Sequence, residues 1–221
     1  MTQSAHTGGL RAVVAVDAHA VTGEGPVWDV DAGQLIWVDI PSGEIHRFDP
    51  ADGTDRVTHV GQPVGAVALR EGGGLLLAVR DGFTAMAGGS DEVEDLRLTM
   101  IAAVEADRPE NRMNDGKVDP AGRFWAGTMA LDSAPGAGTL YRLDTDRSVH
   151  PTLTGLTISN GIDWSPDATT MYFIDSTPGT VTAYDYDQHS GSISQPRTVI
   201  EIPPEDGLPD GMTVHAEGCL W

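Results

Sequence analysis

The sequence is poor in cysteine, in basic residues and in long apolar runs. Its one cysteine, Cys219, can form neither an internal disulfide nor a Cys-x-x-Cys metal site. Lysine and arginine number 13 against 33 aspartates and glutamates, a formal net charge of −20. This balance excludes the basic footprint that nucleic-acid binding requires, and it disfavours anionic membrane surfaces. The longest apolar runs, such as residues 75–79, are far shorter than a membrane span.

The start of the chain also lacks a recognisable export signal. Residues 1–9 are small and polar, with no basic stretch followed by an apolar one. We therefore expect a soluble, cytoplasmic protein with a flexible N-terminus over residues 1–9 and a single domain over residues 10–221. An apolar content of 40% with 21% charged residues is typical of a globular chain rather than a disordered one.

Glycine is abundant and marks an internal repeat. A glycine followed by an apolar strand recurs at Gly25, Gly65, Gly116, Gly161 and Gly211, with spacings of 40, 51, 45 and 50 residues. Polar turns and further short strands rich in Val, Ile, Thr, Tyr and Trp follow each of the first four. A repeat of this length with three or four strands predicts an all-β fold, a β-propeller, with a β-sandwich as the alternative.

The fifth repeat begins at Gly211, only 10 residues before the last residue, Trp221. The repeat therefore predicts about four and a half blades and a C-terminally truncated ring. A strand candidate at residues 10–16 would ordinarily join the last blade, whose remainder is not in the sequence. We expect such a fragment to be unstable or inactive when expressed alone, because an incomplete blade leaves strand edges unpaired.

The residues before the repeated glycines carry the chemistry. They are Glu24, Asn114 with Asp115, Asn160 and Asp210. Equivalent positions of successive blades converge at one end of a propeller's central channel, so these side chains are expected to meet. Carboxylate and amide oxygens suit a hard divalent cation such as calcium or magnesium. The alternative is that aspartate and asparagine only shape turns at these positions.

One long motif resembles a known family. The stretch NRMNDGKVDPAGRFWAGTM at residues 111–129 is similar to a signature of the regucalcin/gluconolactonase (senescence marker protein) family. The shorter motifs GEGPVW at 23–28, ISNGIDW at 158–164 and PDGMTV at 209–214 resemble its other signatures in the same order. The resemblance covers the chain from about residue 14 to its end. It implies a six-bladed propeller and a metal-dependent lactonase that opens a sugar-acid lactone such as gluconolactone.

The resemblance also implies roles for individual residues. One divalent cation, calcium in the first place and zinc, magnesium or manganese otherwise, would be held by Glu24, Asn160 and Asp210. Asp210 would also serve as the catalytic general base. Arg112 and Asn114 would contact the sugar-like substrate. The family's further substrate-contacting glutamate falls on Asp132, whose shorter side chain is expected to reach the substrate only through water.

Several alternatives stay open at this level. The chain could be a non-catalytic calcium-binding regulatory propeller, or a propeller that hydrolyses other esters or organophosphates. Arg112 could instead form a surface ion pair with Glu110 or Asp107. We interpret Asp115 and Asp119 as structural. Packing roles are expected for four apolar side chains, namely inter-blade packing for Trp28, Trp125 and Trp164 and a buried position for Cys219.

Overall fold

The computed structural model describes residues 13–87 and 97–221. It contains sixteen strands in four antiparallel sheets of four strands each, together with one short 3-10 helix, η2 (Pro204–Asp206). Among the described residues no helix has the length and apolar character needed to cross a bilayer. The predicted flexible segment, residues 1–9, lies outside the described residues.

Each sheet is a meander in which consecutive strands pair by short turns. The first sheet contains β1 (Gly23–Asp29), β2 (Gln34–Asp39), β3 (Glu44–Asp49) and β4 (Thr54–His59). The second contains β5 (Val64–Leu69), β6 (Leu75–Val79), β7 (Gly82–Met86) and β8 (Leu98–Ala103). Turn residues such as Asp and Gly separate the strands, as the repeat predicts.

The third and fourth sheets repeat this pattern. The third contains β9 (Asn111–Val118), β10 (Phe124–Ala130), β11 (Gly138–Leu143) and β12 (Val149–Leu156). The fourth contains β13 (Ser159–Trp164), β14 (Thr170–Asp175), β15 (Thr180–Asp187) and β16 (Ser192–Glu201).

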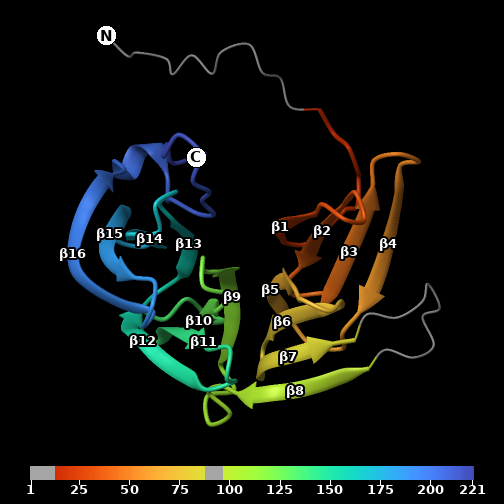
Figure 1. The fold of residues 1–221 in the computed structure, drawn as a ribbon, viewed down its shortest axis with the longest axis horizontal. Coiled ribbons are helices and arrows are strands. Elements are labelled where there is room, and N and C mark those ends of the chain that lie inside the picture. The colour runs from red at the N-terminus through yellow and green to blue at the C-terminus, as the bar shows by residue number, and fades with distance from the viewer. Residues whose placement is uncertain (1–12, 88–96) are drawn as a thin grey trace.

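The sheets stand around a common centre as the blades of a propeller (Figure 1). The first strand of each sheet, β1, β5, β9 or β13, lies innermost, and the fourth strand lies at the rim. The ring formed by the described residues is open between the first and fourth sheets, and the segment after β16 lies on the fourth sheet's side of that opening. The predicted all-β propeller architecture is confirmed.

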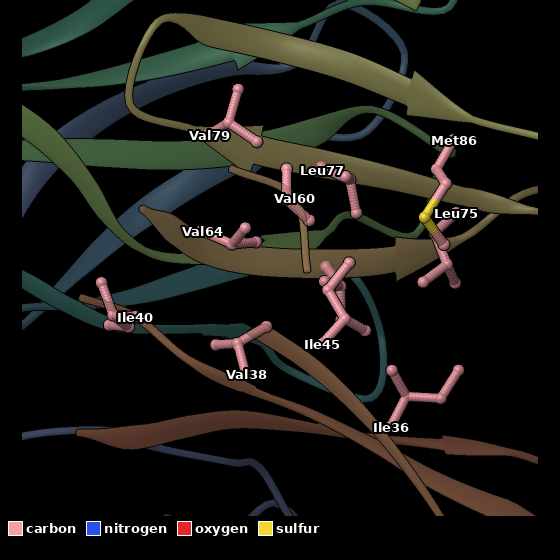
Figure 2. Packing of buried hydrophobic residues seen from close by; sticks show 11 residues of the cluster. Ile36, Val38, Ile40, Ile45, Val60, Val64, Leu75, Leu77, Val79 and Met86 are labelled. Atoms are coloured by element: carbon pink, nitrogen blue, oxygen red, sulfur yellow. The ribbon is translucent and has the colours of Figure 1, made fainter. Parts of the chain in front are cut away.

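Apolar side chains of adjacent blades pack into one core between each pair. Figure 2 shows the core between the first two sheets, where Ile36, Val38 and Ile45 of one blade meet Leu75 and Leu77 of the next. Each of these five side chains is almost completely buried. Two further clusters join the second sheet to the third and the third sheet to the fourth. Burial of apolar area between blades therefore fixes the orientation of the innermost strands.

Some sequence expectations about the ends of the chain are wrong. Trp125 and Trp164 are buried between blades, but Trp28 is 49% exposed, because no described sheet covers its face of the first blade. Cys219 is exposed rather than buried. The described part of the strand candidate at 10–16, residues 13–16, is not a strand. The segment after Gly211 forms only an isolated bridge between Val214 and Leu220.

Candidate functional site

A β-bulge in each innermost strand places the polar residues of the repeat. The pairing register shifts between Glu24 and Val27 in β1 and between Ser159 and Ile162 in β13. It also shifts in β9 at the positions of Asn114 and Asp115, between Met113 and Gly116. A bulge leaves a residue out of the ladder and re-aims its side chain. In the first, third and fourth blades this irregularity thus lies at or directly beside the polar residues of the repeat, namely Glu24, Asn114 with Asp115, and Asn160.

The second blade has the bulge but no polar residue. Its register shifts between Val64 and Ala66, and Val64 is fully buried in the core. Gly65 at this bulge allows the neighbouring strand to approach, since a Cβ built there would lie 2.2 Å from the backbone oxygen of Asn114. The second blade therefore contributes backbone and close packing to the site.

The amide side chains of the site form a continuous hydrogen-bonded row. Arg112 Nη1 donates to Asn114 Oδ1 at 2.7 Å. Asn114 Nδ2 donates both to the backbone oxygen of Ser159 and to Asn160 Oδ1, each at 2.8 Å. Asn160 Nδ2 donates in turn to Ser176 Oγ at 2.7 Å. Asn114 and Asn160 are buried, so this row links the third and fourth blades through satisfied polar groups.

Three carboxylates, those of Glu24, Asp115 and Asp210, interact through their charges in the same region. Burial raises the pKa of Glu24, and the charges of Asp210 and Asp115 raise it further, whereas Arg112 and the backbone N–H of Gly25 lower it. The pKa of Asp115 is raised to about 6, chiefly by burial. The negative charge of Asp210 raises that pKa as well, against a hydrogen bond from Gly116 N. Negative charge therefore predominates among these side chains.

A small hollow between the innermost strands is lined by two of these carboxylates and by the two asparagines. Its lining consists of Glu24, Ile40, Gly65, Asn114, Asp115 and Asn160. Three of the six predicted site residues, Glu24, Asn114 and Asn160, thus lie around one point. Asp115, which we interpreted as structural from the sequence, lines the hollow beside them. The position of Asp115 directly after Asn114 could have indicated that it belongs to the site, but the sequence alone does not show that both side chains line the hollow.

The remaining predicted residues are placed differently. Arg112 and Asp210 act on Glu24 through their charges, although neither lines the hollow. Arg112 forms no ion pair with Glu110 or Asp107 in the described structure, and it also donates to the backbone oxygen of Met113 at 2.9 Å. Asp132 is exposed, and its carboxylate accepts a hydrogen bond from Ala134 N at 3.0 Å, as a turn residue does. No described contact joins Asp132 to the hollow.

Asp119 has the structural role that the sequence suggested. Its buried carboxylate accepts hydrogen bonds from Tyr186 Oη at 2.6 Å, Trp125 Nε1 at 3.0 Å and Arg123 Nη1 at 3.2 Å. These hydrogen bonds outweigh burial and lower the pKa of Asp119. The carboxylate joins the third and fourth blades and does not line the hollow.

The predicted ligand set has the chemistry of a hard-cation site. Glu24 and Asp210 offer anionic oxygens, and Asn160 Oδ1 keeps a lone pair beyond the one that accepts from Asn114. A divalent cation would counter the repulsion that raises the pKa of Glu24. Within residues 13–87 and 97–221 no group of three His, Cys, Asp or Glu side chains is arranged to hold a metal ion. Any such site therefore depends on the asparagine oxygen.

Comparison with known proteins places these features in a family. Residues 22–221 match the SMP-30/Gluconolactonase/LRE-like region. The chain is 43% identical to regucalcin of Xenopus laevis over 204 residues, which covers 90% of this chain and 67% of the relative.

Solved structures agree with this match. A regucalcin of Agrobacterium tumefaciens, described as a calcium-binding protein, superposes with a TM-score of 0.85 at 30% identity. The match covers 91% of this chain and 67% of that one. A gluconolactonase of Xanthomonas campestris superposes with a TM-score of 0.72 at 26% identity, covering 91% of this chain and 69% of that one.

Proposed function

The chain belongs to the SMP-30/gluconolactonase/LRE-like family, and from this premise we propose that it is a metal-dependent hydrolase that opens a sugar-acid lactone. The observation that carries the proposal is the meeting of Glu24, Asn114 and Asn160 around one hollow, with the charges of Asp210 and Arg112 acting on Glu24. The similar gluconolactonase of Xanthomonas campestris supports the choice of a lactone as substrate.

Glu24, Asn160 and Asp210 would hold the cation, with calcium as the first expectation because their oxygens are hard ligands. A bound divalent cation supplies Lewis-acid polarisation of the lactone carbonyl, an effect of several kcal/mol. The two carboxylates would neutralise its charge, and the amide oxygen of Asn160 would add a neutral ligand.

Asp210 is the proposed general base. Its side chain is exposed, so water can reach the carboxylate. The water oxygen forms a bond to the carbonyl carbon while its proton passes to Asp210. The bond from that carbon to the ring oxygen then breaks, and the ring oxygen leaves as a hydroxyl after taking that proton back from Asp210. A base so placed contributes roughly 10²- to 10⁴-fold to the rate.

Arg112 and Asn114 would orient the substrate, but in different ways. Both amide hydrogens of Asn114 already donate inside the protein, and its oxygen accepts from Arg112, so only the second lone pair of that oxygen is left for a substrate hydroxyl. Arg112 uses Nη1 for Asn114 and Met113 and keeps further guanidinium donors for the substrate. Asn114 therefore acts mainly by fixing Arg112 and Asn160.

A pH-stat assay with gluconolactone and related aldonolactones tests the proposal. We expect acid release that chelator abolishes and that calcium, manganese, magnesium or zinc restores to different extents. Replacement of the exposed turn residue Asp167 by alanine is a matched control that should leave the rate unchanged. Acid release that is insensitive to chelator, or absent with every lactone and metal, would contradict the proposal.

A second candidate is a calcium-binding regulatory propeller without turnover. The description of the Agrobacterium tumefaciens relative as a calcium-binding protein favours it, and so does the repulsion from Asp210 and Asp115 that raises the pKa of Glu24. Calorimetric titration with calcium beside the activity assay separates the two functions. Saturable binding with no lactone turnover supports the second candidate, and binding with chelator-sensitive turnover supports the first.

A further inference from the structure

The segment that carries Asp210 runs beside β13 and is attached to it at two points. The first is the hydrogen bond from Gly161 N to the backbone oxygen of Asp210, at 3.2 Å. A Cβ built on Gly161 would lie 2.8 Å from that oxygen and 2.7 Å from Met212 Cβ. Only glycine permits this close approach. The second attachment point is the side chain of Asp163, two residues further along β13.

Asp163 gathers donors from three separate parts of the chain. Its Oδ2 accepts from Val214 N at 2.8 Å and from Thr213 Oγ1 at 3.2 Å. The same oxygen accepts from Lys117 Nζ of β9 at 2.6 Å, and Oδ1 accepts from Trp164 N at 2.8 Å. The Asp163 side chain is 17% exposed and that of Lys117 38%. A shielded, charge-assisted pair of this kind is stronger than one in open water.

We propose that Asp163 is a positioning residue that fixes Asp210 beside Glu24, with Lys117 as its charge partner. The inference rests on the proposed function, in which Asp210 is a metal ligand. The exposed carboxylate of Asp210 has no described hydrogen bond of its own, so its place depends on its backbone. Gly161 holds that backbone at Asp210, and Asp163 holds it at residues 213 and 214.

The position of Asp163 explains why it matters for the site. Lys117 and Asn114 lie on β9, and Asp163 and Asn160 lie on β13. The Lys117–Asp163 contact and the Asn114–Asn160 hydrogen bond therefore join the same two strands. The first contact also reaches the segment of Asp210, whereas the second does not. Residues behind a ligand typically change metal affinity by 10- to 100-fold when they are removed.

Two variants of Asp163 separate its hydrogen bonds from its charge. Asp163→Ala removes the acceptor for Val214 N and Thr213 Oγ1. Asp163→Asn keeps one oxygen for them, but it removes the charge opposite Lys117 and the second acceptor, which takes the hydrogen bond from Trp164 N. Asp167→Ala is the matched control, because Asp167 accepts three hydrogen bonds in a turn of the same sheet. Asp167 has no described contact with residues 210–214.

The readouts are calorimetric titration with calcium alone and hydrogen–deuterium exchange of a peptide covering residues 208–221. We expect Asp163→Ala to weaken calcium binding by about tenfold or more and to accelerate exchange in that peptide. Asp163→Asn should restore binding to within about threefold of the unmodified chain, and Asp167→Ala should change neither readout. If Asp163→Ala does not fold, Asp163→Ser replaces it, because the shorter hydroxyl cannot span to residue 214.

The outcomes are distinguishable. Unchanged exchange and calcium affinity in Asp163→Ala overturn the positioning role, and so does an equal loss of affinity in Asp167→Ala. If Asp163→Asn loses as much as Asp163→Ala, the hydrogen bonds are not the cause and the proposal fails as stated. If the unmodified chain binds no calcium, manganese, magnesium or zinc, the proposed function fails, while the exchange of residues 208–221 still decides whether Asp163 holds the segment.

Discussion

The two halves of the site differ in how far the protein alone stabilises them. In the amide half, Arg112, Asn114 and Asn160 are joined by hydrogen bonds of 2.7–2.8 Å. In the carboxylate half, burial and mutual repulsion raise the pKa values of Glu24 and Asp115. The amide half is thus organised by its own hydrogen bonds, whereas in the carboxylate half the positive charges of Arg112 and Lys117 do not offset burial and repulsion. This contrast suggests that the amide half stabilises the fold, whereas the carboxylate half provides affinity for a cation at some expense of stability.

The largest effect that tests this contrast is expected from Asp210→Asn. The variant loses an anionic ligand and the general base, so lactone turnover should fall by roughly 10²- to 10⁴-fold. The stability of the chelator-treated chain should stay equal or rise, because the substitution removes a charge that raises the pKa of Glu24. Acid release in a pH-stat and urea unfolding measure the two quantities.

Asp206→Asn is the control for that experiment, since Asp206 is an exposed aspartate four residues earlier in the chain. It should keep the turnover of the unmodified chain. In Asp210→Asn, the fraction of folded protein could instead fall as much as the turnover does. That result would mean that the carboxylate half also supports the fold. The contrast between the two halves would then be wrong.

Asn114→Ala should have the largest effect on stability. It removes the donor to Ser159 and Asn160 and the acceptor for Arg112, all in a buried setting. Leaving such partners unsatisfied should lower the free energy of unfolding by about 3 kcal/mol. Ser176→Ala, which removes one hydrogen bond at the end of the row, should lower it by about 1 kcal/mol. Urea unfolding in chelator checks both values.

A loss below about 0.5 kcal/mol in Asn114→Ala would show that the amide row is not a structural element. A rise in stability would have the same meaning. Either result would remove the basis for contrasting the two halves. The Ser176 variant calibrates this comparison. Ser176, in the turn after β14, belongs to the same row but its side chain makes only the hydrogen bond to Asn160, so its loss of stability should be smaller than that of Asn114→Ala.

Asp115→Asn should change stability in the opposite direction. The folded-state pKa of Asp115 is about 6, whereas an unfolded aspartate titrates near 3.9. Between these values the native chain keeps a proton that the unfolded chain has released, so this group lowers stability as the pH rises from about 4 to 6. The asparagine variant lacks this loss. It should therefore be more stable than the unmodified chain by about 3 kcal/mol at pH 7 and nearly equal to it at about pH 4.

Urea unfolding in chelator across this pH range measures the difference. Asp31→Asn, a substitution of an exposed turn residue, should show no pH-dependent gain. A constant difference at every pH would mean that hydrogen bonding rather than charge distinguishes Asp115 from asparagine. Addition of calcium should reduce the advantage of the variant, since a bound cation favours the ionised carboxylates of the unmodified chain.

The sequence predicted the architecture well because one local rule repeats. Each glycine at the first four repeat positions falls in the innermost strand of a blade, and the polar residues before it lie at bulges. The prediction was wrong for Trp28, whose burial depends on what packs against the first sheet rather than on its own strand. The local sequence pattern determines where a strand forms, but the exposed fraction of its side chains depends on the tertiary contacts of the sheet.

The site was predicted less completely for a related reason. Residue types and spacing indicated Glu24 and Asn160, but they did not indicate that Asn114 uses its amide hydrogens inside the protein. They also gave no reason to connect Lys117 and Asp163, which lie 46 residues apart on adjacent blades. Hydrogen bonds between blades depend on side-chain directions that bulges set, and these directions are not legible in a repeat pattern.

The smallest effect is expected at Asp132, which belongs to neither half. Its carboxylate is exposed and accepts a hydrogen bond from Ala134 within its own turn. Asp132→Ala should therefore change the free energy of unfolding by less than about 0.5 kcal/mol. If the side chain reaches substrate only through water, KM should rise by no more than about threefold, because a bridging water is a modest contributor to binding. Asp132→Glu sharpens the test: its longer side chain should lower KM by direct contact while kcat stays constant. An unchanged KM in both variants would remove Asp132 from the substrate site and leave specificity to Arg112 and Asn114.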